Sequence, residues 1–273
     1  YTTLFRSLDD PRHPQFPELR PQIYNHEAMP YEGCILGYFT VWQGPENNVC
    51  DSLNIQKRNE VLIGWSKDGF HWNRENKKPF LPVSEDFHAW NAGNVQSTAG
   101  SPLIVGDSLY FYVSGRYNSK PKHDSNFATG LAMLRRDGFV SMRAGRKEGY
   151  IEIKTQIPAN GNYLFVNADV KGTLAVEVLD DNGQPMEGFT KKDCISMKKS
   201  DKTKQMISWE KHPGVTSLVG KTVRLKFYLN QADIYAFWIS AWQTGESGGY
   251  TGGGGPGLSD EGIDTPMDKL KNN

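Results

Sequence analysis

The chain is predicted to be all-β, with repeated blade-like sheets followed by an antiparallel β-sandwich. Three observations predict this class: an imperfect repeat between 29–72 and 101–140, short alternating apolar runs along most of the chain, and the lack of a convincing amphipathic helix. Turn-forming residues are plentiful, with 28 Gly and 15 Pro among 273 residues, which a chain of many short strands requires.

The repeat is clearest at two matched positions. Pro30 and Pro102 lie 72 residues apart (102 − 30 = 72), and so do Tyr38 and Tyr110 (110 − 38 = 72). Each copy then closes on an Asp-Gly pair, which is a common tight turn between strands. A sheet of this size cannot bury both of its faces alone, so such repeats typically pack radially as propeller blades.

The strands of the first half follow from short apolar or alternating runs. Two polar stretches, 44–59 and 116–126, are predicted as long loops, where ligand contacts tend to lie. The expected strands are 28–33, 35–42, 60–66, 70–73, 94–99, 109–114 and 129–135.

The pattern changes at Gly149, after which alternating runs and turn signals follow one another for about a hundred residues, as in a β-sandwich. We therefore predict β-propeller blades over 1–148, a β-sandwich over 149–243 and a disordered Gly-rich tail over 244–273. The main runs of the sandwich are 150–154, 163–170, 173–179, 206–209, 223–229 and 234–239.

Charge and composition narrow the function. Lys plus Arg and Asp plus Glu both number 31, which argues against a nucleic acid or a membrane surface as the partner. The three cysteines match no metal motif, and no cofactor is predicted. Cys34 is expected to be a buried apolar residue, although a Cys34–Cys50 disulfide stays open. The chain carries no signal peptide and begins at Tyr1, so it is expected to be processed or truncated.

Several local signatures, taken in order, resemble the five-bladed β-propeller proteins of glycoside hydrolase families 32 and 43 with an appended β-sandwich. The resemblance covers roughly 1–243. The residues that carry it are Tyr24–Gly33, Ser66–Trp72, Gly100–Pro102, Gly106–Tyr112, Leu134–Phe139, Leu164–Ala168, Glu177–Asp180 and Leu225–Leu229.

The resemblance implies a secreted or periplasmic protein that acts on an oligo- or polysaccharide of plant or algal origin. It also implies that this chain is the C-terminal portion of such a protein. Two blades cannot close a ring, so the missing N-terminal blades are expected from the same parent chain or from another chain.

Hydrolysis of a glycosidic bond needs two carboxyl groups across the scissile bond. The resemblance implies that the catalytic Asp residues belong to early blades, and that the general acid is a Glu opening an inner strand. Glu27 is the first candidate and Glu32 the second.

Sugar contacts are expected from amide, aromatic and basic side chains of the inner strands and long loops. For each of them a purely structural role stays open; Trp90, for instance, would fill a gap between blades. Glu27 and Trp90 are expected to face one common cavity. The candidates are His26, Tyr31, Trp90, Asn91, Asn94, Gln96 and Arg116, with His123 at the rim.

The sequence thus predicts a glycosidase, with two rivals. One is a non-catalytic glycan-binding module, which the missing Asp residues favour. The other is a structural or partner-binding fragment whose propeller is completed in a complex.

Overall fold

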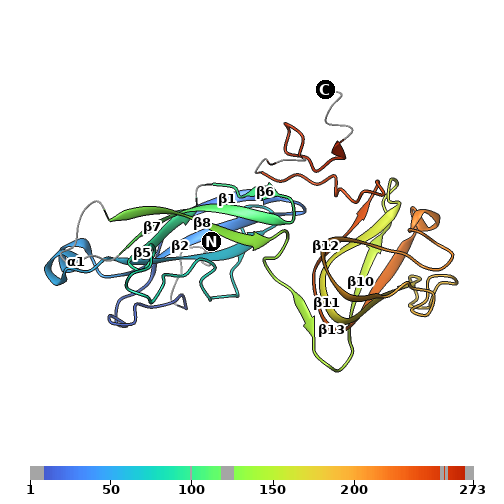
Figure 1. Cartoon of the computed structure of the whole chain (residues 1–273), viewed down its shortest axis with the longest axis horizontal. Helices are drawn as coiled ribbons and strands as arrows, with labels where there is room; N and C mark the ends of the chain where they lie inside the picture. Colours follow the sequence, from blue (N-terminus) through green and yellow to red (C-terminus); the bar gives the residue numbers. More distant parts are fainter. Residues whose placement is uncertain (1–8, 99, 118–125, 253–254, 256–257, 268–273) are drawn as a thin grey trace. The chain divides into compact units, whose positions relative to one another are not determined.

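A computed structural model describes residues 9–98, 100–117, 126–252, 255 and 258–267. Figure 1 shows an architecture of strands, which make up 51% of the structure against 4% helix, and this confirms the predicted all-β class. The contacts divide the chain into two units. Unit 1 comprises 1–105, 110–133 and 249–255, and unit 2 comprises 106–109, 134–248 and 256–273.

The first sheet of unit 1 is an antiparallel meander in the order β1-β2-β3-β4. A two-residue turn at Glu32-Gly33 joins its first two strands, and Glu32 takes a positive φ of 50° there. The bounds are β1 Gln22–Tyr31, β2 Cys34–Gly44, β3 Arg58–Ser66 and β4 Trp72–Asn73.

The second sheet of unit 1 has the same plan. β5 and β6 both pair with β7, and together they take the place that β1 has in the first sheet. β8 also pairs with β7 and takes the place of β3. Tyr38 and Tyr110, which the repeat matches, both lie in the second strand of their sheet. The bounds are β5 Asn94–Thr98, β6 Leu103–Val105, β7 Ser108–Arg116 and β8 Phe127–Arg135.

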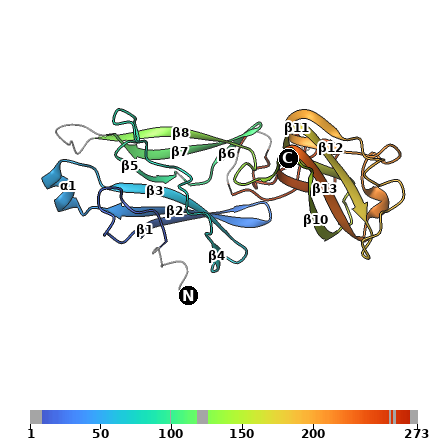
Figure 2. The same cartoon turned by 90° about the horizontal axis from the view of Figure 1, so that it is seen from below.

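The two sheets of unit 1 lie face to face, as Figure 2 shows. Alternation along β2 places Tyr38 on the face toward the second sheet, where its ring packs edge-on against Phe111 with centroids 5.8 Å apart. Phe39 points to the opposite face and forms a buried cluster with Val41, Leu62 and Trp72. Sheet 1 is therefore buried on both sides.

A short helix that the sequence did not predict, α1 (Asn47–Leu53), lies between β2 and β3. Only one of its seven residues, Cys50, is buried. A single buried position cannot show the apolar repeat by which a helix is recognised in a sequence. The helix ends where Asn54 adopts the left-handed conformation, with a φ of 57°.

Unit 2 contains one five-stranded sheet in the order β10-β13-β11-β12, with β9 paired to β13. Two of its strands are long and bent, so the sheet curls around a single apolar core that includes Leu164, Val176, Trp209 and Phe227 (Figure 1). The bounds are β9 Met142–Ala144, β10 Gly149–Gln156, β11 Tyr163–Leu179, β12 Met197–Ile207 and β13 Thr222–Ser240, with a 3₁₀ turn η1 at Thr216–Leu218.

The predicted runs 163–170 and 173–179 are two halves of the single strand β11. Lys171-Gly172 has the composition of a turn, yet the chain only shifts register there, between Val170 and Thr173. A Cβ on Gly172 would lie 2.4 Å from the carbonyl oxygen of Asn230, so glycine permits the close approach of β13 at this bend. The runs 223–229 and 234–239 are likewise halves of β13.

The described residues after Trp242 are held by hydrogen bonds, whereas the sequence predicted disorder. The Gly252 N–H donates to the carbonyl of Pro30 (2.8 Å), and Thr251 pairs with Tyr31. The Gly248 N–H donates to the carbonyl of Asp264 (3.0 Å). Glycines reduce the apolar signal of the segment, but its backbone still pairs with other segments.

Among the described helices, none has the length and apolar character that a membrane span requires. Within the part of the chain that the structure describes, no disulfide joins Cys34 to Cys50, and Cys34 is only half-buried.

Candidate functional site

The inner strands of the two sheets meet along a polar line that we call the seam. From β5, the hydroxyl of Thr98 donates a hydrogen bond to the Glu27 carboxylate on β1. From β2, the hydroxyl of Thr40 donates to the backbone carbonyl of Gln96. At the far end of β5, the Asn94 side-chain amide donates to the Lys57 carbonyl at 2.8 Å. Glu27, the backbone of Gln96 and Asn94, which the sequence named from two different repeats, thus make contacts at separate points along the seam.

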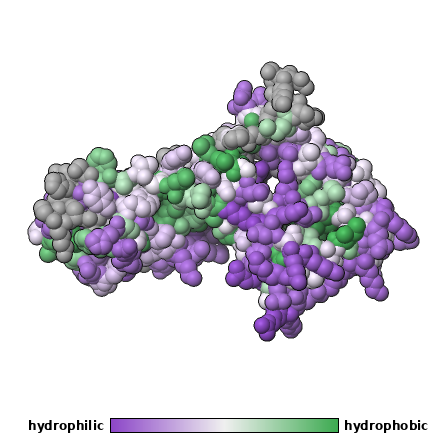
Figure 3. All heavy atoms as spheres, in the orientation of Figure 1, coloured by the Kyte–Doolittle hydropathy of each residue, from purple (hydrophilic) through white to green (hydrophobic). Residues whose placement is uncertain are grey.

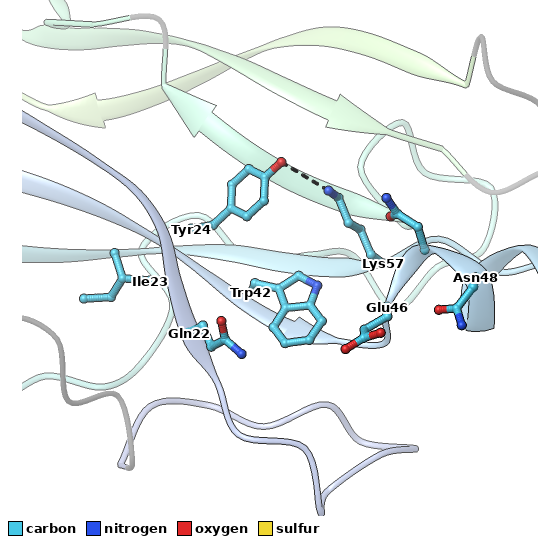
Figure 4. A pocket seen from close by; sticks show the side chains of 8 residues that line it. Gln22, Ile23, Tyr24, Trp42, Glu46, Asn48 and Lys57 are labelled. Carbon is cyan, nitrogen blue, oxygen red and sulfur yellow. Dashed lines mark hydrogen bonds between the residues drawn. The ribbon is translucent and has the colours of Figure 1, made fainter.

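A pocket of about 560 Å³ opens beside Lys57 at this end of the sheet (Figure 4). Its walls come from the start of β1, the end of β2 and the segment around α1. We call it the seam pocket. Its lining residues are Gln22, Ile23, Tyr24, Trp42, Glu46, Asn47, Asn48 and Lys57.

Two aromatic rings dominate the seam pocket. Figure 4 shows the Trp42 indole in the middle of the lining residues, with Tyr24 on one side and Glu46 on another. The Lys57 ammonium lies 4.6 Å from the centre of the Tyr24 ring and donates to its hydroxyl at 3.2 Å. Tyr24 is 48% exposed, so the ring is held in place while much of it stays open to a ligand.

Buried amides lie next to the pocket. Asn59 faces Trp42 across the strand pair and is fully buried, yet neither its amide nitrogen nor its oxygen has a partner among the described residues. The side-chain oxygens of Asn25 and Asn94 are also buried without a described partner. Buried polar groups are normally paired, so this end of the seam holds unused donors and acceptors.

Glu27 lies half-buried on the seam, opposite Tyr38. Burial, and then the charge of Glu27, raises the pKa of the Tyr38 phenol above its usual range. Glu46 lines the seam pocket, whereas Glu27 does not.

His26 lies on the opposite face of sheet 1, because it is the neighbour of Glu27 on the same strand. Its ring stacks on Phe39 at 4.2 Å and meets Trp72 edge-on at 4.6 Å. Burial and the nearby Arg74 lower the pKa of His26. The structure therefore places His26 in an aromatic cluster and away from Glu27.

Trp90 packs on two glycines of the second sheet. A Cβ added to Gly115 or Gly130 would lie 2.5 Å or 2.4 Å from its indole ring. Trp90 is 37% exposed, and neither it nor Glu27 lines the seam pocket. The contact fits the alternative in which Trp90 fills space against a blade.

The other predicted residues are dispersed within unit 1. The Asn91 side chain donates to the carbonyl of Pro82 (3.0 Å), and Arg116 pairs with Asn94 in the β5–β7 ladder. Tyr31 is buried at the end of β1, and the Glu32 N–H donates to the carbonyl of Tyr250 (2.8 Å). His123 lies outside the described residues.

The lining residues Gln22, Trp42, Glu46 and Lys57 were not identified from the sequence. A signal for Trp42 was available, because alternation along β2 places it on the same face as Tyr38. Glu46 and Lys57 carried no such signal, since they belong to a long polar loop whose path depends on α1.

No known protein family and no curated protein matches the chain. Among solved structures there is a weak likeness to a crystal structure described as a "putative glycoside hydrolase" from Parabacteroides distasonis ATCC 8503. The identity is 14% and the TM-score 0.31, and the match covers 62% of this chain and 53% of that chain. The chain thus spans about half the length of that protein, and the likeness is too small to assign it to a family.

Proposed function

We propose that unit 1 binds an oligo- or polysaccharide in the seam pocket. The observation that carries this proposal is the pair of aromatic rings, Tyr24 and Trp42, set beside a carboxylate, an ammonium and side-chain amides. The face of a sugar ring offers C–H groups to an aromatic ring, while its hydroxyls need both donors and acceptors. The seam pocket supplies both kinds of contact within one ligand-sized volume.

The charges of the pocket favour an uncharged glycan. Its lining includes one cation, Lys57, and one anion, Glu46, so an anionic or cationic ligand would meet no net attraction. This fits the zero net charge of the whole chain.

The test compares two tryptophans of the same sheet. Trp42→Ala should weaken binding of the best ligand from a panel of plant and algal oligosaccharides by at least about tenfold, or about 1.4 kcal/mol, because an aromatic anchor is lost. Isothermal titration calorimetry measures the change. Trp65→Ala is the matched control, since Trp65 is 45% exposed on β3 but outside the pocket.

Equal binding by the Trp42→Ala protein and the unmodified protein would exclude the seam pocket as the glycan site. A loss confined to Trp65→Ala would move the site to the other end of sheet 1.

Hydrolysis of the bound glycan is a second candidate function. The supporting observation is that Glu27 lies half-buried on the same seam, held by Thr98 of the neighbouring sheet. A carboxyl group at this position, when protonated, would donate a proton to a leaving group. Its partner carboxylate would come from further blades.

Glu27→Gln tests the hydrolytic candidate in the full-length parent chain. Turnover of an activated glycoside should fall by orders of magnitude, because the amide cannot donate the proton, while the thermal midpoint stays nearly unchanged. Glu75→Gln, an exposed carboxylate beyond β4, is the control. Unchanged turnover in Glu27→Gln would remove this residue from any catalytic role.

We further propose that the two sheets of unit 1 are neighbouring blades of a larger propeller in an exported protein. The face of sheet 1 that carries Tyr38 is covered by sheet 2, whereas the corresponding face of sheet 2 is open. Figure 3 shows hydrophobic atoms gathered over β6, β7 and β8. A further sheet, from the same parent chain or another chain, would pack there. The exposed apolar residues are Leu103, Tyr112, Phe127, Leu131 and Met133.

A further inference from the structure

A second pocket of unit 1 lies on the other side of the segment that follows α1. Its volume is about 310 Å³, at the lower end for ligand pockets. Asn54, Ile55 and Gln56 contribute to it, whereas the next residue, Lys57, lines the seam pocket. The two pockets share no lining residue. We call the second one the His13 pocket, after the most buried polar side chain that lines it.

His13 is a hydrogen-bond donor of fixed orientation. It is 7% exposed, and its Nδ1 atom accepts the Gln15 N–H at 3.1 Å. Burial, and then the charge of Arg58, lowers the pKa of His13, which favours the neutral ring. A neutral imidazole whose Nδ1 accepts a hydrogen bond carries its proton on Nε2. That N–H is therefore the donor left for a ligand.

Arg58 is a second hydrogen-bond donor that lines the pocket. Its guanidinium donates to Glu60 at 3.1 Å and to Glu85 at 2.9 Å. The Arg58 Nε atom is buried without a partner among the described residues. That atom is enclosed, so the N–H groups that a ligand can reach are those at the end of the guanidinium, next to Glu85.

The charges around this pocket exclude an anion as the preferred ligand. Glu60 is buried and held by Gln43 at 2.6 Å and by the Val83 N–H at 3.0 Å. Arg58 faces the carboxylates of Glu60 and Glu85, and the charge of Glu18 also acts on His13, so carboxylates outnumber cations around the pocket. An anionic ligand would be repelled, whereas an uncharged one would not.

An apolar surface completes the pocket. Phe87 is 42% exposed and lines it together with Pro14 and Ile55. Glu85 is exposed on the same rim, and its side chain is an acceptor for hydroxyl groups.

We infer that the His13 pocket binds one uncharged pyranose ring, with His13 and Arg58 donating to ring hydroxyls, Glu85 accepting from one, and Phe87 stacking on the ring face. The volume suits a single sugar unit rather than a chain. The ligand class rests on the proposed function, but the site is separate from the seam pocket.

Saturation-transfer difference NMR on the unmodified chain tests this, with neutral methyl pyranosides as probes and a methyl glucuronide as the anionic comparison. The unmodified protein should give signals with at least one neutral probe and markedly weaker ones with the glucuronide. Phe87→Ala and Glu85→Gln should each reduce the neutral signal severalfold. Both side chains are exposed, so both variants should fold.

Matched controls are Phe70→Ala, whose side chain is 83% exposed in a turn, and Glu75→Gln, also exposed. Neither residue lines this pocket. If Trp42→Ala abolishes all signals while Phe87→Ala has no effect, the His13 pocket is excluded and the seam pocket stands. If Phe87→Ala abolishes them while Trp42→Ala has no effect, the inference holds and the proposed function fails.

Discussion

At the scale of the residue, neighbours in one strand have opposite environments. Glu27 meets the hydroxyl of Thr98 on the seam, whereas His26 stacks on Phe39 in an apolar cluster. The sequence analysis named Glu27 from the family resemblance and its neighbour His26 as a sugar contact. Their separation follows from the two-residue period of a strand, which was available as soon as β1 was assigned.

The half-buried position of His26 among aromatic rings predicts an acid-sensitive fold. Its pKa is lowered in the folded state, so below the ordinary value of 6.5 the unfolded chain takes up the proton first. Stability is then complete above about pH 6.5 and is lost as pH falls toward the folded pKa. His26→Phe should therefore show a smaller drop in thermal midpoint between pH 7.5 and 5.0.

Differential scanning calorimetry at the two pH values measures this difference. His88→Gln is the control, because the His88 side chain is exposed. Parallel pH profiles for the unmodified protein and His26→Phe would contradict the prediction.

At the scale of the element, turns were easier to predict than bends. Asp68-Gly69 lies in the five-residue connection between β3 and β4, and two backbone N–H groups donate to the Asp68 carboxylate. The hydrogen bonds from His71 hold the pKa of this carboxyl well below its usual range. In contrast, Lys171-Gly172 also has turn-like composition but only bends β11. Local composition does not reveal whether a partner strand continues past the interruption.

The bend of β11 can be tested with Gly172→Ala. The added Cβ would collide with the backbone oxygen of Asn230, which cannot move without breaking the β11–β13 ladder. The free energy of unfolding of unit 2 should fall by about 1–3 kcal/mol, as for other overpacked sites. Urea denaturation followed by tryptophan fluorescence provides the measurement.

Gly145→Ala is the matched control for this substitution, since nothing lies within 4 Å of a Cβ at Gly145. Equal losses of unfolding free energy in the two variants would show that replacing a glycine is costly in itself. The close approach of Asn230 would then not explain the effect.

At the scale of the whole molecule, one face of sheet 2 carries apolar side chains that the described residues leave exposed. Exposed apolar patches of this kind commonly mark interaction surfaces. Leu131→Ser combined with Met133→Ser should leave the thermal midpoint of this chain nearly unchanged, because both side chains are already exposed. Binding of a hydrophobic dye should fall in the same variant.

Phe111→Ser is the contrast, since Phe111 is 2% exposed between the two sheets. Phe111→Ser should lower the free energy of unfolding by about 3–5 kcal/mol, the usual range for removing a buried aromatic ring. A comparable cost for the double variant would mean that the face is already covered, and would remove the need for a further sheet.

The sequence by itself determined the strand-rich class, the duplicated sheet and most strands of the first half, because these depend on local alternation and on turns such as Asp68-Gly69. It also placed Glu27, Asn94 and Gln96 on inner strands. Only the tertiary structure decided that Trp42, Tyr24 and Lys57 meet in one pocket and that β11 continues through its bend. The physical reason is that a period of two tells which side chains share a face, whereas the partner that covers that face comes from contacts between residues distant in sequence.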